Sequence, residues 1–144
     1  MAATFHQIIE SDFAELKRLM DAATQFLEGQ GVDAQAIFRI NLTLEEIVTN
    51  IIKFGHGDQT AHRIDIAVNV SPDNVEAVII DEGHEFNPVL HEREAPSEIL
   101  TERTTGGLGI FLIKKLLGSM KYRREGKRNI VEVRAQRKQN SKPD

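Results

Sequence analysis

Apolar residues recur at helical spacing in the first third of the chain. A short strand is expected over residues 4–9. A helix is predicted to begin near Asp12, because Asp12 followed by Glu15 has the form of a capping box. Gly29 and Gly31 mark its end. Its apolar positions are Phe13, Leu16, Met20, Ala23 and Leu27.

A second amphipathic helix is predicted over residues 33–54, closed by Gly55 and Gly57. Alternating apolar and polar residues then predict strands over 62–70 and 75–81, joined by a turn at 71–74. The apolar side of the helix comprises Ile37, Ile40, Leu44, Ile47, Val48 and Ile51.

The remainder predicts a long polar loop over residues 82–105, an apolar helix over 108–117 and a final hairpin. The hairpin pairs residues 121–125 with 129–136 and turns at 126–128, and a frayed tail is expected from residue 138. Strands joined mostly in consecutive hairpins, together with helices, predict a single α+β domain over residues 1–144, with helices on one face of a sheet.

Composition is that of an ordinary globular domain, with 40% hydrophobic and 28% charged residues in 144. The absence of cysteine excludes disulfide scaffolds, cysteine nucleophiles and thiolate metal sites. No apolar run approaches the roughly 20 residues that cross a bilayer. The N-terminus does not have the form of a signal peptide. A cytoplasmic protein without membrane contact is therefore expected.

Charge is unevenly distributed along the chain. The net charge of −4 argues against direct nucleic-acid binding. Residues 1–112 hold 19 acidic and 7 basic side chains, and residues 113–144 hold 3 and 11, which together give the 22 and 18 of the whole chain. The basic segment is either a solvated surface or a docking face for an acidic partner.

The first candidate site is Glu46 with Asn50, four residues apart on one face of the second predicted helix, with Lys53 close to the same stripe. Oxygen donors of this kind suit Mg²⁺ that is shared with phosphates. The carboxylate is also suited to accept a proton from an attacking hydroxyl. A solvated helix face is the simpler interpretation of this pair alone.

The second candidate is the stretch from Asp81 to Pro88, at the end of an apolar strand in which residues 78–80 are expected to be buried. An acceptor such as Asp81 suits the exocyclic amine of adenine, and Gly83 permits close approach of a ring. An ordinary strand-to-turn transition is the alternative.

The third candidate is the glycine-rich run from Thr104 to Gly109, which opens the predicted apolar helix. Open backbone N–H groups at a helix N-terminus favour phosphates. The run is neither a Walker A motif nor a Rossmann fingerprint. A tight connection explains such a run equally well. The five histidines are better explained as surface or loop residues than as metal ligands.

Taken in order, Glu46-x-x-x-Asn50, Asp81-x-Gly83 with Phe86-Asn87-Pro88, and Gly106-Gly107-Leu108-Gly109 resemble the N, G1 and G2 boxes of the GHKL ATPase superfamily. The compact form, without a phosphoacceptor helix pair, resembles the RsbW-like anti-sigma factor serine-protein kinases of bacterial partner-switching systems. The sequences of residues 44–53 and 107–114 are close to those usual in that group. A fragment of a two-component histidine kinase is a further alternative, and it is not expected because these 144 residues contain no phosphoacceptor hairpin.

The resemblance implies a Bergerat-type two-layer α/β sandwich, with a mixed, mostly antiparallel sheet and an ATP lid at about residues 88–105. It implies that ATP and Mg²⁺ bind between helices and sheet, with Glu46 as general base and Asn50 as the Mg²⁺ ligand. Further implied nucleotide contacts are Lys53, Asp81, Gly83, Arg103, Thr105, Gly107, Leu108 and Gly109.

By the same resemblance the protein is expected to be a serine/threonine kinase and anti-sigma factor. It would phosphorylate a STAS-type anti-anti-sigma protein, hold a sigma factor inactive, and pair as a homodimer. The alternative is a non-catalytic ATP-binding module that binds sigma factor or another regulator. The sequence of residues 54–56 differs from the one usual in the family. Glu82 and Glu85 add negative charge beside the adenine box.

Overall fold

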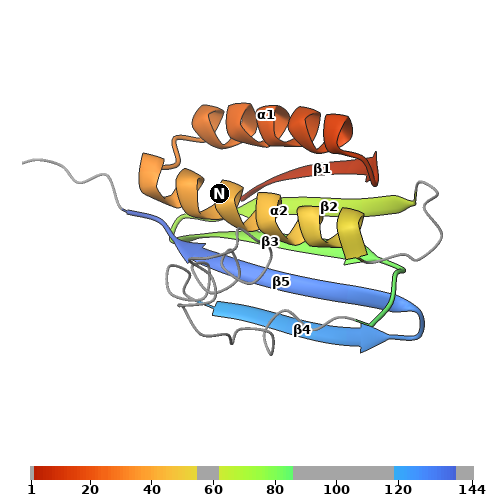
Figure 1. Cartoon of the computed structure of the whole chain (residues 1–144). Coiled ribbons are helices and arrows are strands. Elements are labelled where there is room, and N and C mark those ends of the chain that lie inside the picture. Colours follow the sequence, from red (N-terminus) through yellow and green to blue (C-terminus); the bar gives the residue numbers. More distant parts are fainter. Residues whose placement is uncertain (1, 55–61, 86–118, 139–144) are drawn as a thin grey trace, which may run out of the picture.

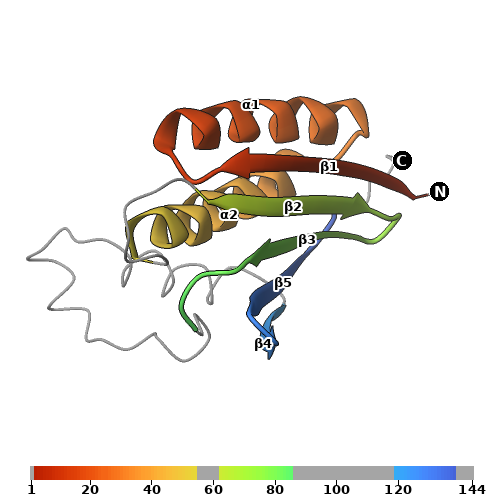
Figure 2. The same ribbon diagram turned by 90° about the vertical axis from the view of Figure 1, so that its right-hand side faces the viewer.

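Two helices cover one face of a five-stranded sheet in the computed structural model, which describes residues 2–54, 62–85 and 119–138 (Figures 1 and 2). In chain order the described elements are β1 (Ala3–Glu10), α1 (Phe13–Gly29), α2 (Ala34–Phe54), β2 (Arg63–Val70), β3 (Asn74–Asp81), β4 (Ser119–Glu125) and β5 (Arg128–Gln136). This is the expected α+β sandwich. The predicted strands and helices that fall in the described ranges agree with these bounds to within two residues.

The strands run in the order β1-β2-β3-β5-β4, and all four described pairings are antiparallel. The β4–β5 hairpin turns through the two residues Gly126 and Lys127, one residue fewer than the predicted turn. Gly126 adopts a positive φ of 62°, which two-residue hairpin turns require and which glycine adopts without strain. Because β4 lies at the sheet edge, the final hairpin places its β5 strand directly beside β3.

Every strand alternates between a side chain facing the helices and one facing away, as the period of two requires. In β3 this alternation corrects the expectation that residues 78–80 are all buried. Ile79 is 1% exposed, whereas Val78 and Ile80 are half-buried on the sheet face opposite α1 and α2. The continuous apolar run resembled a strand covered on both faces, but in the described part of the chain helices cover only one.

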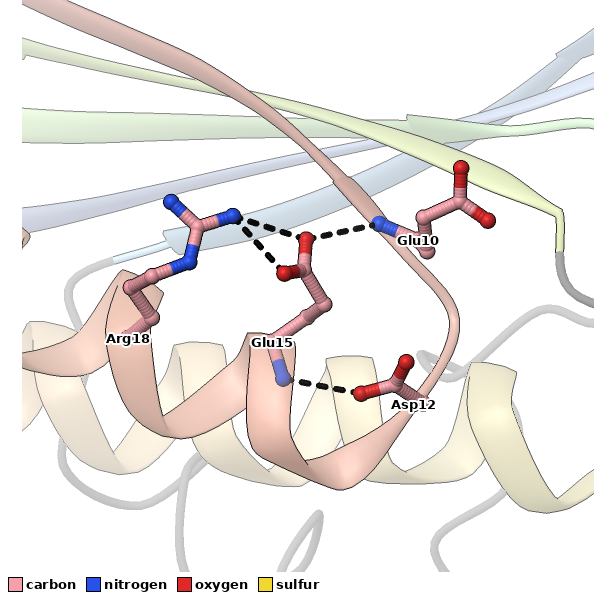
Figure 3. A network of polar contacts seen from close by, with 4 residues as sticks. All are labelled: Glu10, Asp12, Glu15 and Arg18. Atoms are coloured by element: carbon pink, nitrogen blue, oxygen red, sulfur yellow. Dashed lines mark hydrogen bonds and ion pairs between the residues drawn. The ribbon is translucent and has the colours of Figure 1, made fainter.

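The start of α1 is held by a polar network around Glu15 (Figure 3). Asp12 caps the helix as predicted, since its carboxylate accepts from the Glu15 N–H at 2.9 Å. The reciprocal arm differs from a capping box, because Glu15 Oε1 accepts from the N–H of Glu10, not from that of Asp12. Arg18 donates to both Glu15 oxygens at 2.8 Å. The network joins the end of β1 to the first turn of α1.

At the opposite end of the molecule, Arg137 and Asp33 form hydrogen bonds that connect segments distant in the sequence. Arg137 donates to the carbonyl of Ser71 at 2.8 Å and to that of Gly31 at 3.3 Å. Asp33 accepts from the N–H of Ala36, in the first turn of α2, and from the N–H of Lys138. These contacts attach the end of β5 to the α1–α2 connection and to the β2–β3 turn.

The core fills the space between the helices and the sheet. Phe13 is an exception to the apolar pattern of α1, because half of it (51%) is exposed at the helix start. In the described ranges no helix is long and apolar enough to span a membrane. Lys138, where the frayed tail was predicted to begin, is held by Asp33 at 2.8 Å. The rest of that tail, the predicted lid, the 108–117 helix, Gly55 and Gly57 lie outside the described residues. The fully buried large side chains are Ile9, Leu19, Leu27, Ile40, Leu44, Ile64, Ile66, Ile79, Val48 and Val68.

Candidate functional site

The last turns of α2 carry three of the predicted site residues. Ile47 and Ile51 are buried, which directs the helix's apolar face toward the sheet. Asn50 lies beside them and is only 4% exposed, whereas Glu46 is half-buried and Lys53 is exposed. The three residues follow the i, i+4, i+7 spacing of one helix stripe, as the sequence predicted.

The side-chain amide of Asn50 is buried, and within the described part of the chain it makes no hydrogen bond. Neither its Oδ1 nor its Nδ2 finds a partner among the described residues. A buried amide in this state costs about 1–3 kcal/mol, so native proteins rarely retain one without a reason. An oxygen donor that is buried but uncommitted is suited to a ligand that supplies its missing contact.

Glu46 has a strongly shifted acidity. Partial burial raises the pKa of its carboxyl, the neighbouring charge of Glu45 raises it further, and Lys53 lowers it, which together bring the pKa to about 7. The side chain is therefore close to half-ionised at neutral pH. A carboxyl in this state is matched to proton transfer near neutrality, where general bases are most effective.

The end of β3 carries the second predicted pair. Asp81 is 5% exposed and lies on the helix-facing side of the sheet, in register with Ile64 of β2 and Asn129 of β5. Its Oδ2 accepts from the Gly83 N–H at 2.7 Å, which forms a tight turn directly after the strand. The buried carboxylate is thus held in place at the strand end by the turn that follows it.

Asn129 was not among the predicted site residues, yet it is buried beside Asp81. Its Nδ2 donates to the His84 carbonyl at 2.9 Å, with longer contacts of 3.4 Å to Asp81 Oδ1 and 3.5 Å to the Gly83 carbonyl. One feature of the sequence could have identified Asn129 as a site residue, namely its position on the apolar face of a strand. Asn129 occupies the helix-facing register of β5, where the following positions are apolar: Val131, Val133 and Ala135.

The candidate residues of α2 and those at the end of β3 lie toward the same end of the molecule, because α2 and β3 end on the same side (Figure 1). A cavity of about 600 Å³ also reaches Asp81, but its other described lining residues include none from α2. Two of them, Asp65 and Ile80, belong to the sheet face opposite α1 and α2. This cavity is therefore distinct from the Glu46–Asn50 surface. Its described lining is His62, Arg63, Asp65, Ile80, Asp81, Glu82 and Arg128.

Five predicted nucleotide contacts lie outside the described residues, and the structure does not place them: Arg103, Thr105, Gly107, Leu108 and Gly109. Across the described ranges, no three His, Asp or Glu side chains are arranged to hold a metal ion. A divalent cation at Asn50 would therefore need donors from beyond the protein side chains described, such as phosphate oxygens and water.

An open antiparallel sheet with both helices on one face, carrying a carboxyl of pKa about 7 and a buried amide, defines a two-layer α+β domain with a polar site at one end. The profile of the family described as histidine kinase-like ATPase domain matches residues 9–135. The chain belongs to this family. The predicted resemblance to the GHKL superfamily is confirmed.

Two curated relatives place the chain near the RsbW group. It is 26% identical over 95 residues to the serine-protein kinase RsbW of Oceanobacillus iheyensis, a match that covers 63% of this chain and 60% of that protein. It is 22% identical over 86 residues to the serine-protein kinase RsbW of Bacillus velezensis, which covers 57% of this chain and 54% of that protein. The matched regions span little more than half of each relative.

A solved structure shares the fold. The crystal structure of the RsbU and RsbW domains of Rv1364c from Mycobacterium tuberculosis superposes with a TM-score of 0.63 at 15% identity. The superposition covers 94% of this chain and 32% of that longer one. At this identity the likeness shows the common fold alone.

Proposed function

We propose that this protein is an ATP-dependent serine/threonine protein kinase and anti-sigma factor that phosphorylates a STAS-type anti-anti-sigma protein. The observation that carries the proposal is the pair on α2, an uncommitted buried Asn50 one turn from a Glu46 whose pKa is about 7. Membership of the histidine kinase-like ATPase family and similarity to serine-protein kinases named RsbW support it.

Asn50 fits the role of a Mg²⁺ ligand. Its amide oxygen is a hard donor, it is buried, and it lacks a hydrogen-bond partner within the described chain. When bound there, Mg²⁺ would offset the negative charge of the ATP phosphates. The positive charge of Lys53, at the exposed end of the same stripe, supports binding of those phosphates as well.

Glu46 is proposed as the base that accepts the proton of the substrate hydroxyl. A carboxyl with an ordinary pKa of 4.5 is a weak base at neutral pH, whereas one with a pKa of about 7 accepts a proton more readily and is still largely ionised above pH 7. Phosphoryl transfer asks for little covalent chemistry beyond this, because positioning and charge compensation supply most of the acceleration.

Asp81 is proposed to accept the adenine amine, with Gly83 beside the ring. The burial of Asp81 supports this role, because a hydrogen bond to a carboxylate that is shielded from water discriminates strongly between bases that offer a donor and bases that do not. Gly107 and Gly109 remain predicted phosphate contacts and Leu108 a predicted nucleotide contact, with Arg103 and Thr105 near the γ-phosphate.

The test uses calorimetric titration with Mg·ATP and Mg·ADP, followed by transfer of labelled γ-phosphate to a STAS-type protein from the same genome. Wild type is expected to bind in a Mg²⁺-dependent manner and to label the STAS-type protein. Asn50→Ala should lose the Mg²⁺ dependence. Glu46→Ala should bind Mg·ATP as the wild type does and label nothing, so equal labelling by Glu46→Ala and wild type would overturn the role of the base.

The second candidate function is a regulator-binding module that uses ATP only as a ligand, and the basic final hairpin favours it. Residues 119–138 carry eight basic and two acidic side chains, a surface suited to an acidic partner. Binding of Mg·ATP without any transfer, together with a salt-sensitive complex with a sigma factor, would select this candidate. Under both candidate functions, the kinase and the regulator-binding module, a homodimer and a cytoplasmic location remain predictions.

A further inference from the structure

The β4–β5 hairpin supplies a hydrogen-bond network beneath the turn that follows Asp81. Asn129 of β5 lies at its centre, where its Oδ1 accepts from the hydroxyl of Tyr122 at 2.7 Å and from Nη1 of Arg124 at 3.0 Å. The same Arg124 nitrogen donates to the Gly83 carbonyl at 2.9 Å. The hairpin thus reaches the turn through one amide and one guanidinium.

These contacts determine how the Asn129 amide is oriented. The guanidinium of Arg124 can only donate, so the Asn129 atom facing it must be the oxygen. The Nδ2 group consequently faces Asp81 and the carbonyls of Gly83 and His84, all of which are acceptors. The reversed amide would place an oxygen against a carboxylate and two carbonyls, and its N–H groups against a cation. Arg124 therefore selects the orientation that holds the turn.

Two consecutive arginines of β4 have different surroundings. Arg124 is half-buried and faces the helix side of the sheet, paired in register with Asn129. Arg123 is exposed on the other face, where it forms ion pairs with Glu125 and Glu132 at 2.7 Å. Of these two arginines, Arg124 alone contacts the described part of the turn after β3, which gives a matched pair of the same residue type on one strand.

We propose that Arg124, acting through Asn129, is a positioning residue that holds Asp81 and the Gly83–His84 backbone in the geometry that distinguishes adenine from guanine. The hydroxyl of Tyr122 supports the same amide oxygen. This inference rests on the proposed nucleotide site. The base preference depends on where the Asp81 carboxylate lies, because a hydrogen bond weakens steeply as its distance and angle depart from the optimum.

The experiment compares Arg124→Met with Arg123→Met by calorimetric titration of Mg·ATP and Mg·GTP. Loss of a charge-assisted hydrogen bond predicts that Arg124→Met binds Mg·ATP about tenfold more weakly. Its ATP-over-GTP preference should fall by a similar factor, because GTP has no 6-amino group to lose. Arg123→Met should keep both affinities. Tyr122→Phe, which removes one donor to Asn129, should shift the preference in the same direction by about threefold.

Amide hydrogen exchange without nucleotide provides a second measurement. The Gly83 N–H, which donates to Asp81, should exchange faster in Arg124→Met than in wild type. In Arg123→Met its exchange rate should equal that of wild type. An unchanged base preference and unchanged exchange in both Arg124→Met and Tyr122→Phe would overturn the positioning role and leave the proposed function intact. Failure of the wild type to bind Mg·ATP would overturn the proposed function, and the base preference inferred here with it.

Discussion

Replacing Glu46 by Gln should make the protein more stable at alkaline pH. The folded state raises the pKa of Glu46 from its ordinary 4.5 to about 7, so between these values the folded chain holds a proton that the unfolded chain has released. The contribution of this group to stability is therefore fully present below pH 4.5 and is lost as pH rises to 7. Gln, which matches the protonated carboxyl in shape, does not titrate and escapes this loss.

The magnitude follows from the size of the pKa change. A move from 4.5 to about 7 corresponds to about 3 kcal/mol of differential stability between the protonated and ionised forms. Because Glu46 is only half-buried, solvent screening reduces the expected effect to about 1–2 kcal/mol. For a domain of this size that is a rise in Tm of about 3–6 °C.

Urea unfolding of wild type and Glu46→Gln at closely spaced pH values from 4 to 9 measures this effect. The stability difference should be small at pH 4, grow between pH 4.5 and 7, and stay constant above that. Glu45→Gln is the control, because Glu45 is exposed and acts on the site only as a screened neighbouring charge. A difference that does not depend on pH, or a Gln variant less stable than wild type at pH 8, would refute the assigned pKa and its cause.

Three further predictions concern single side chains. Lys53→Met should move the acidic limb of the transfer pH profile to higher pH, because Lys53 lowers the pKa of the base, and initial rates between pH 6 and 9 at saturating Mg·ATP measure this. Asn50→Leu should raise the free energy of unfolding of the nucleotide-free protein by about 1 kcal/mol, since it removes a buried amide that has no partner among the described residues. Mg²⁺-dependent binding should be lost, and urea unfolding and calorimetry test the two parts. Asp33→Ala should cost about 1 kcal/mol at pH 7. Burial alone raises the pKa of Asp33, but the N–H groups of Lys138 and Ala36 outweigh it and the pKa lies below 3.8, so the cost should shrink in urea unfolding only as pH falls through that lowered value.

Most elements could be predicted from local signals. The capping residue Asp12, the helical recurrence of apolar positions and the turn at Ser71 all act within a few residues, so their consequences are visible in a single stretch of sequence. The candidate residues Glu46 and Asn50 were identified in the same way, because the helix period alone brings them to one face.

The errors arose where a residue's surroundings come from distant parts of the chain. Val78 and Ile80 were expected to be buried, but which sheet face the helices cover depends on packing across the whole domain. Asn129 was missed because its role arises from β3 and β4 lying on either side of β5.

The sequence by itself determined the elements, their order and the residue types of the candidate site, because helix and strand periods and turn chemistry are local properties. Tertiary structure decided the acidity, burial and hydrogen bonding of those residues. Burial and neighbouring charge raise the pKa of Glu46, and packing leaves the Asn50 amide without a hydrogen-bond partner among the described residues. The final hairpin brings Arg124 to the turn after Asp81, 41 residues away from Gly83 in the chain. Desolvation and hydrogen bonding depend on which atoms surround a group in space, and only the folded chain brings those atoms together.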